Sequence, residues 1–291
     1  MGSAGFGVRQ GSRSGAALHE TAHLIPPPWL WPNLLSLDAP IIAVLWQSFL
    51  AWRYSLLLRP SGRVTLFLAV WAIYIGDRLL DVRKPATTGE SARHRFYRAH
   101  QKLATAVLGV VLAITAAITI LDLRPAVLRN GLIPLSAVVA YLAILNFTKT
   151  RQVAKELVVA FVFTTGTFLV AWTNDPVSPL MLLAPASAFF LLCLANLTAI
   201  EAWEWTELRN GAEPPHGTTR ALVRTVRIWV PAITVLTALR AADPWYLAIA
   251  FSAGAITLLL FIGRRASIEL RRVLVDAAML TPLLLPFLRT R

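Results

Sequence analysis

The sequence predicts an all-α integral membrane protein with about nine transmembrane helices. The 291-residue chain is 56% hydrophobic and only 15% charged, whereas a soluble globular domain carries roughly 25% charged residues. Its apolar runs approach the length of about 20 residues that crosses a bilayer as a helix. These runs do not alternate with a period of two, as the strands of a membrane barrel do. Together, the three observations favour a helical bundle.

Polar breakers divide the chain into nine apolar runs. RPSGR ends the first run, DVRKPATTGE the second, DLRP the third and TKTRQVAK the fourth. NDPVSP ends the fifth, a polar loop through Thr219 the sixth, ADP the seventh and RRASIELRR the eighth; Pro and Gly mark many of these turns. The predicted spans cover residues 36–57, 63–82, 103–121, 126–147, 156–173, 179–203, 222–240, 245–263 and 273–289.

The segment before the first span is rich in Gly and Ser, with scattered Arg and no apolar core. This composition predicts a flexible cytoplasmic tail over residues 1–28, rather than a signal peptide. Residues 29–291 are expected to form one transmembrane domain. The single cysteine, Cys193, excludes a disulfide framework and a cysteine-based metal site.

The formal charge of +13 lies mostly in short segments between apolar runs. With the N-terminus inside, the inner segments carry 18 Lys and Arg residues and the outer segments carry 8. This asymmetry predicts a cytoplasmic N-terminus in the inner membrane, and it explains the basic charge without nucleic-acid binding.

Two acidic segments stand at the ends of otherwise apolar runs. Asp77 and Asp81 lie in IYIGDRLLDVRK, and Glu201, Glu204 and Glu207 lie in NLTAIEAWEWTEL. An ionised carboxylate at a membrane edge costs free energy unless something pairs with it. An even number of spans separates the two segments, so both are expected to face the cytoplasm.

The spacing of Asp77 and Asp81 places both carboxylates on one helix face, with Arg78 expected on another. Magnesium accepts a few carboxylate oxygens, retains waters and completes its coordination with substrate phosphates. Two such helices facing each other therefore predict a site for Mg²⁺ and a diphosphate. Lys149, Arg151 and Arg93 are expected to supply further positive charge.

These features resemble the UbiA superfamily of intramembrane prenyltransferases. That family has nine helices, with aspartate-rich motifs at the cytoplasmic ends of the second and sixth. Asp77 and Asp81 match the two Asp positions of its NxxxDxxxD motif, while Ile73 stands at the Asn position. NFTKTRQVAKEL resembles the segment after its fourth helix, with Lys149 at the Lys position and Arg151 displaced by one.

The second motif of the family is usually DxxxD-like and is often preceded by Asn. Asn196 and the three glutamates occupy that region here, with Glu in place of Asp and irregular spacing. The missing Asn at position 73 removes one oxygen ligand, and each Glu extends about one methylene further than Asp. The layout covers the chain from about residue 30, and it rests on the order of the motifs.

The resemblance implies a UbiA-like bundle that ionises a polyprenyl diphosphate on Mg²⁺ and transfers the prenyl group to an acceptor. Metal ligands would be Asp77, Asp81, Glu201, Glu204 and Glu207. Catalytic residues would be Asp77, Asp81, Glu204 and Lys149. Substrate-binding residues would be Lys149, Arg151, Tyr74, Asn196 and Arg93, with Tyr74 one turn before Asp77.

Several alternatives stay open at this point. A UbiA-type terpene cyclase would use the same ionisation without an acceptor. A transporter or non-catalytic scaffold predicts acids deep within the spans and inverted repeats. The acidic residues could also simply pair with nearby arginines. Gln47 is expected to form a hydrogen bond between helices, and Asp276 to pair with Arg272.

Overall fold

Helices make up the regular structure of the protein. The computed structural model describes residues 26–83, 91–122, 125–132, 136, 140, 154–173, 178–207 and 217–285. Within these ranges there is no strand, which confirms the predicted all-α class. The predicted N-terminal tail and most of the predicted fourth span lie outside the described residues.

Among the residues that the structure describes, five helices are long and apolar enough to cross a membrane. They are α6 (Gln101–Asp122), α8 (Lys155–Trp172), α9 (Pro179–Glu207), α10 (Gly217–Ala238) and α11 (Pro244–Ile262). A sixth crossing results if Pro28–Leu34 and Asp38–Arg53, bent by 83°, form one span. These helices indicate a membrane-embedded protein. The described residues thus support five or six crossings, and the count of nine stays a prediction.

The other helices are shorter or more polar. They are η1 (Pro28–Leu30), α2 (Trp31–Leu34), α3 (Asp38–Arg53), α4 (Pro60–Asp81), α5 (Ala92–Ala99), η2 (Gly263–Arg265), α12 (Ile268–Ala277) and η3 (Ala278–Leu284). α4 has the 22 residues of α6 and matches the predicted second span, but it carries charges near its end and does not count among the five.

Local signals fix where several helices begin. Pro60 and Pro244 each stand at the first position of a helix, where a missing N–H costs nothing. Ser91 and Ser267 cap α5 and α12, because their hydroxyl oxygens accept hydrogen bonds from the backbone N–H groups three residues later, at 3.5 and 3.3 Å. These residues coincide with the breakers that divide the sequence.

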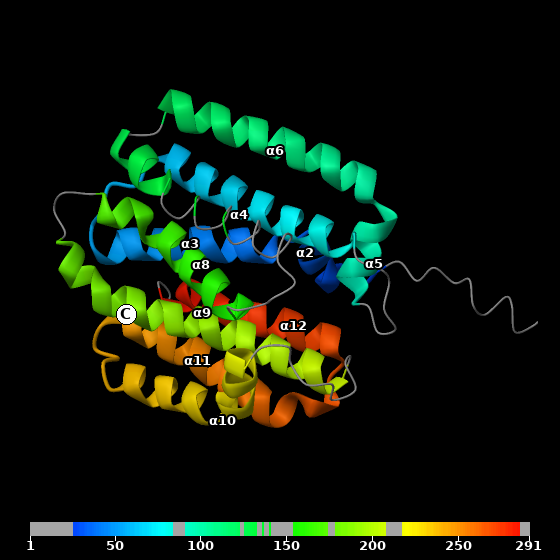
Figure 1. Cartoon of the computed structure of the whole chain (residues 1–291). Coiled ribbons are helices and arrows are strands. Elements are labelled where there is room, and N and C mark those ends of the chain that lie inside the picture. Colours follow the sequence, from blue (N-terminus) through cyan, green and yellow to red (C-terminus); the bar gives the residue numbers. More distant parts are fainter. Residues whose placement is uncertain are drawn as a thin grey trace, which may run out of the picture.

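The arrangement places α9 at the centre of one half of the bundle, where it packs against α8, α10, α11 and α12. α4 lies between α3 and α6, and α6 forms the edge of the bundle (Figure 1). Val111 is the one buried residue of α6. Most of α6 is therefore left to face lipid or the part of the chain outside the described residues.

An aromatic cluster fills the interior between α3, α8, α9 and α11. Its members are Trp46, Phe49, Phe168, Phe189 and Trp245, all buried. The ring centroids of Trp46 lie 4.8 Å from Phe189 and 5.2 Å from Trp245. Both indole N–H groups donate to backbone carbonyls, Trp46 to Met279 at 2.8 Å and Trp245 to Pro185 at 3.1 Å. The cluster therefore locks four helices together.

The predicted ninth span differs from the structure. It was expected over 273–289, but α12 begins at Ile268 and ends at Ala277, where a 3₁₀ helix continues to Leu284. Pro282 lies inside that 3₁₀ segment, and proline cannot donate the backbone hydrogen bond that would continue an α-helix. The charged first turns of α12, predicted as a loop, are helical and partly buried.

Candidate functional site

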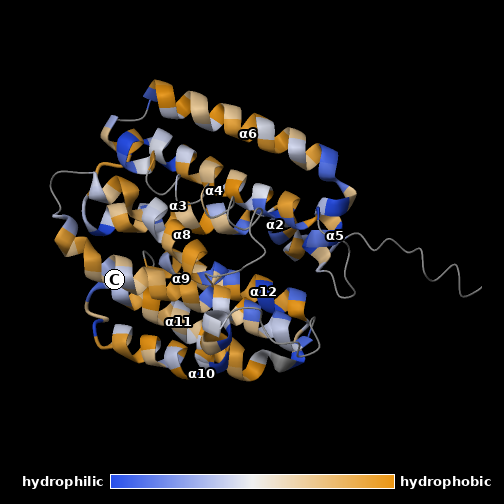
Figure 2. Ribbon diagram, viewed as in Figure 1, coloured by the Kyte–Doolittle hydropathy of each residue, from blue (hydrophilic) through white to orange (hydrophobic). Residues whose placement is uncertain are grey.

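Both acidic segments lie at the same end of the bundle, as the sequence predicts. α4 ends there at Asp81, α9 ends there at Glu207, and α5 and α12 begin there. Figure 2 shows hydrophilic residues gathered around α5 and α12 on the right, while the middle of the bundle is largely hydrophobic. We call this end of the bundle the charged end. Its paired ionised side chains are those of Asp77, Arg78, Asp81, Arg93, Lys155, Glu204, Glu207, Glu269, Arg271 and Arg272.

The two aspartates of α4 pair with cations. Both carboxylate oxygens of Asp77 accept hydrogen bonds from Lys155 Nζ, at 2.8 and 2.9 Å. Arg78 Nη1 lies 3.2 Å from Asp77 Oδ2 and 3.6 Å from Asp81 Oδ2. Asp81 Oδ2 also lies 3.6 Å from His94 Nε2. The expectation that Arg78 faces away was wrong, because its long side chain folds back between the two carboxylates.

The glutamates of α9 pair with arginines from two other helices. Glu204 Oε1 lies 2.5 Å from Arg272 Nη2 and 3.4 Å from Arg93 Nη2. Glu207 pairs with Arg271. Glu201 is half-buried one turn earlier on the same helix. Arg272 also contacts Glu269 of its own helix at 3.2 Å, while the pairs with Glu204 and Glu207 join α12 to α9.

The expected pair between Arg272 and Asp276 is wrong. Arg272 turns to the two glutamates, and Asp276 Oδ1 instead accepts a hydrogen bond from Asn196 Nδ2 at 3.1 Å. The same amide nitrogen donates to Val275 O at 3.0 Å. Asn196 is thus buried against α12, and its role as a substrate-binding residue stays a prediction.

The short helix α5 brings Arg93 to the charged end. Tyr97, on the buried face of α5, donates to Ser36 Oγ at 3.1 Å. The N–H of Ala92 donates to Glu269 Oε1 at 2.9 Å, and Arg98 donates to the carbonyl of Val82 at 2.9 Å. These contacts hold α5 across the ends of α4 and α12, so Arg93 points to Glu204.

Four arginine side chains with little exposure to solvent lie at the charged end. The side chains of Arg78, Arg93, Arg271 and Arg272 are 9%, 13%, 3% and 1% exposed. In each of them the buried Nε atom has no hydrogen-bond partner among the described residues. Burial, together with the nearby guanidinium groups of Arg78 and Arg272, lowers the pKa of Arg93 to about 10. It remains a cation at neutral pH, and the crowding of positive charge favours an anion nearby.

Tyr74 is half-buried on α4, within electrostatic range of Arg78 and Asp77. It packs against a small apolar cluster formed by Ala39, Ala43, Leu66 and Val70. The predicted positions of Lys149 and Arg151 lie outside the described residues. Lys155, from the same basic segment of the sequence, is the residue that pairs with Asp77.

The carboxylates are of the kind that magnesium binds, but their arrangement is not that of a formed metal site. Across the residues the structure describes, no group of three or more Asp, Glu, His or Cys side chains is placed to hold one ion. A guanidinium or ammonium group stands beside Asp77, Asp81, Glu204 and Glu207 instead. These carboxylates are therefore chemically suited to magnesium. To bind it, they would have to leave the basic side chains that they now contact.

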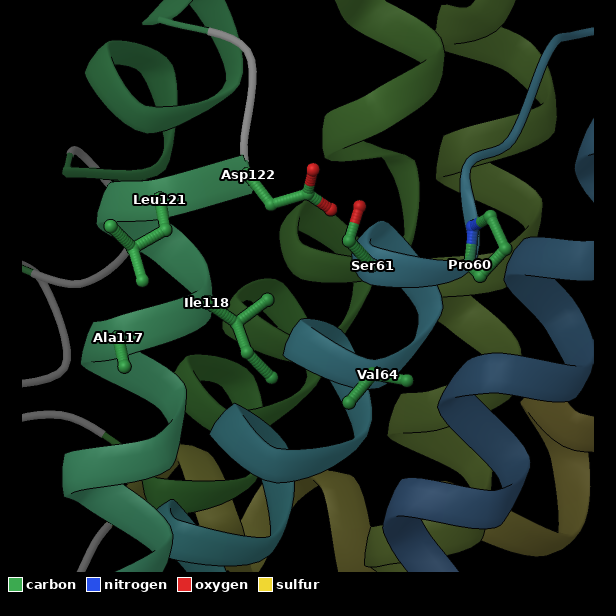
Figure 3. Close-up of a pocket in the computed structure, with 7 residues that line it drawn as sticks. All are labelled: Pro60, Ser61, Val64, Ala117, Ile118, Leu121 and Asp122. Atoms are coloured by element: carbon green, nitrogen blue, oxygen red, sulfur yellow. The ribbon is translucent and has the colours of Figure 1, made fainter.

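An apolar groove lies at the opposite end of the bundle, between α4 and α6 (Figure 3). Its volume is about 410 Å³, and its walls include Val64, Ile118 and Leu121. Pro60 at its rim precedes Asp77 by 17 residues of helix, or about 25 Å at 1.5 Å per residue. The groove is consequently remote from the ionised side chains.

Sequence reasoning missed several residues of the charged end. Arg271 and Arg272 were assigned to a loop, although their positions on α12 aim them at α9. The signal was present in SIEL, where Ser267 precedes Glu269 as a helix start does. Lys155 is the last residue of the breaker TKTRQVAK and was not selected as a site residue.

Comparison with known proteins identifies no relative, since no family model, curated protein or solved structure matches the chain. The UbiA resemblance therefore stays a prediction from the order of the motifs. The structure contributes the geometry: acids of α4 and α9 and arginines of α4, α5 and α12 converge at one end of the bundle.

Proposed function

We propose that this protein is a UbiA-like membrane prenyltransferase, which ionises a polyprenyl diphosphate at the charged end and transfers the prenyl group to an acceptor. The observation that carries the proposal is the convergence of Asp77, Asp81 and Glu204 with three buried arginines and the half-buried Arg93 at one end of an apolar bundle. A polyprenyl diphosphate has an apolar chain and a multiply charged head group. Its site therefore needs apolar surroundings for the chain and charged side chains for the diphosphate.

The burial of charged side chains favours the interpretation that this end is a functional site. Removing ions from water costs several kcal/mol each, roughly, and a buried ion pair seldom repays that cost in stability. Ionisable residues buried within the membrane-embedded part of a protein are therefore candidates for a functional site. Arg272, at 1% exposure between Glu204 and Glu269, is the clearest instance.

The proposed roles follow the chemistry of each group. Arg78, Arg93, Arg271 and Arg272 bind phosphate oxygens, for which planar guanidinium groups are suited. Asp77, Asp81 and Glu204, with Glu201 or Glu207, would hold Mg²⁺. Magnesium, when bound, supplies charge neutralisation for the leaving diphosphate. Lys149, Arg151, Tyr74 and Asn196 remain proposed contributors to substrate binding.

The reaction breaks the allylic C–O bond, and the diphosphate leaves with the electron pair. A nucleophile of the acceptor then donates an electron pair to the prenyl cation and loses a proton. The arginines favour the first step because they stabilise negative charge as it develops on the leaving oxygen.

The proposal includes nine membrane crossings, a cytoplasmic N-terminus and an active site that opens to the cytoplasm. The excess of Lys and Arg in the inner segments supports this orientation. A terpene cyclase would also use the charged end to bind and ionise a prenyl diphosphate. Incubation with a prenyl diphosphate alone separates the two, because only a cyclase forms a terpene hydrocarbon or alcohol without an added acceptor.

Asparagine substitutions test the proposal. Asp77→Asn and Asp81→Asn should each lower diphosphate release from a prenyl diphosphate by about 100-fold or more, as expected when electrostatic support of a leaving group is lost. Asp122→Asn is the matched control, since Asp122 is exposed at the far end of α6 and should not affect release. Parental turnover in both α4 variants would refute the proposal.

A further inference from the structure

Three of the acids proposed to bind the cation, Asp77, Asp81 and Glu204, already have cationic partners. Asp77 is held by Lys155 at 2.8 Å, and Glu204 by Arg272 at 2.5 Å. Arg78 bridges Asp77 and Asp81. A divalent cation that approached these carboxylates alone would meet guanidinium and ammonium groups at short range, and like charges repel strongly where water is scarce.

The same pairs also oppose a lone anion. A diphosphate that approached the arginines without a cation would meet Asp77, Asp81 and Glu204. The described ion pairs join five acids with five cations, so the network is close to neutral. The side chains of Arg271 and Arg272 are almost fully buried, and excess charge of either sign is costly there.

We infer that the charged end binds a divalent cation and a diphosphate only together, by exchange of ion-pair partners. The carboxylates of Asp77, Asp81 and Glu204 pass from the basic side chains to the cation, while the freed guanidinium groups pass to the phosphate oxygens. The charges brought in largely cancel, so the network stays close to neutral. This inference rests on the proposed function, and it adds that the pairs make each ligand a requirement for the other.

In this exchange, Glu204 would pass to the divalent cation and Arg272 would pass to the phosphate oxygens. Arg272 spans Glu204 and Glu269, and its Nε has donor capacity that no atom of the described residues uses. Glu204 holds both Arg272 and Arg93. Removal of one side should free the other, and the two ligands should respond in opposite directions.

The experiment measures binding to purified protein in nanodiscs by calorimetry and by the unfolding temperature. Four titrations use MgCl₂ alone, sodium pyrophosphate alone, and each of the two in the presence of the other. We expect the apparent Kd of each ligand to fall at least about tenfold when the other is present, a usual size for coupling between ligands. Free concentrations are held fixed, because magnesium also complexes pyrophosphate in solution.

Two variants decide between exchange and simple complex formation in solution. Glu204→Gln should strengthen binding of pyrophosphate alone, because it frees Arg272 and Arg93, and should weaken binding of magnesium. Arg272→Gln should do the reverse. Arg53→Gln is the control, since it removes an ion pair to Asp243 at the opposite end and should change neither affinity. If Arg272→Gln does not fold, Arg93→Gln replaces it, because Arg93 makes the longer contact to Glu204 at 3.4 Å.

The outcomes separate this inference from the proposed function. Binding of either ligand alone as tightly as in the presence of the other would overturn the exchange and leave the proposed function standing. Equal weakening of both ligands in both variants would overturn it too. No binding of pyrophosphate, with or without magnesium, would overturn the proposed function and this inference with it.

Discussion

Arg78 and Arg272 each contact two carboxylates, so that Arg78 joins Asp77 to Asp81 and Arg272 joins Glu204 to Glu269 at the charged end. The sequence allowed Asp77, Asp81 and Glu204 to be selected, since acids at the ends of apolar runs are rare. It could not supply their partners, because an arginine side chain can reach either of several helices. Its direction depends on how those helices pack.

Gln47 presents a different case at the residue scale. It is buried at 3% exposure in α3, and its side-chain oxygen has no hydrogen-bond partner among the described residues. The bond expected between helices is therefore not found at that oxygen. A buried amide oxygen without a hydrogen bond is destabilising, so we expect the unpaired oxygen of Gln47 to lower stability.

We predict that Gln47→Leu raises the stability of the ligand-free protein by about 1–2 kcal/mol, because leucine has a similar volume and needs no hydrogen bond. Thermal unfolding in detergent measures the change. A clear loss of stability would show that Gln47 already has a partner, and would contradict the description of its oxygen as unpaired.

At the scale of the elements, apolar runs and their breakers located most helices to within a few residues. α6, α8 and α11 match the predicted spans closely, because each consists of an apolar run between strong breakers. The prediction was poorest at α12, where an amphipathic helix turns Arg271 and Arg272 into the protein. A hydropathy pattern treats such charges as the end of a span, whereas burial of a charged face depends on tertiary partners.

Arg53 and Asp243 tie α3 to α11 at the end opposite the charged end. Arg53 Nε and Nη2 donate to the two oxygens of Asp243, at 2.8 and 2.9 Å. Asp243 Oδ1 also accepts from the N–H of Trp245 at 2.9 Å and thereby caps α11. The contributions of the ion pair and of the helix cap to stability can be measured separately, because asparagine caps a helix well but carries no charge.

Asp243→Asn should therefore cost about 1 kcal/mol or less, since the pair is partly exposed. Asp243→Ala should cost about 1 kcal/mol more, because it also removes the cap. Arg53→Gln should resemble Asp243→Asn. The measurement is thermal unfolding of the three variants in the same detergent. Equal stability of Asp243→Asn and Asp243→Ala would contradict a capping role.

For the whole molecule, the excess of basic residues in alternate segments predicts which end faces the cytoplasm. The charged end should be inside, and the loop between α10 and α11 should be outside. Arg240 in that loop and Arg265 in η2 are both exposed, whereas Cys193, the only cysteine, is buried. Cysteine labelling can therefore report the orientation.

In intact cells, Arg240→Cys should react with a membrane-impermeant maleimide, and Arg265→Cys should react only after the membrane is permeabilised. The parent protein, with Cys193 alone, is the control and should remain unlabelled. The reverse pattern for the two variants would place the charged end outside and would contradict the proposed cytoplasmic site.

Release of diphosphate by the parent protein tests the central claim most directly. Purified protein is incubated with C10 to C20 prenyl diphosphates, with magnesium or with EDTA, and both diphosphate and extracted products are followed. We predict magnesium-dependent release that requires an acceptor, with a prenylated acceptor as the product. Release without an acceptor, together with a terpene product, would instead identify a cyclase. No release from any chain length, with any acceptor tried, would contradict the claim that the charged end is a prenyl diphosphate site.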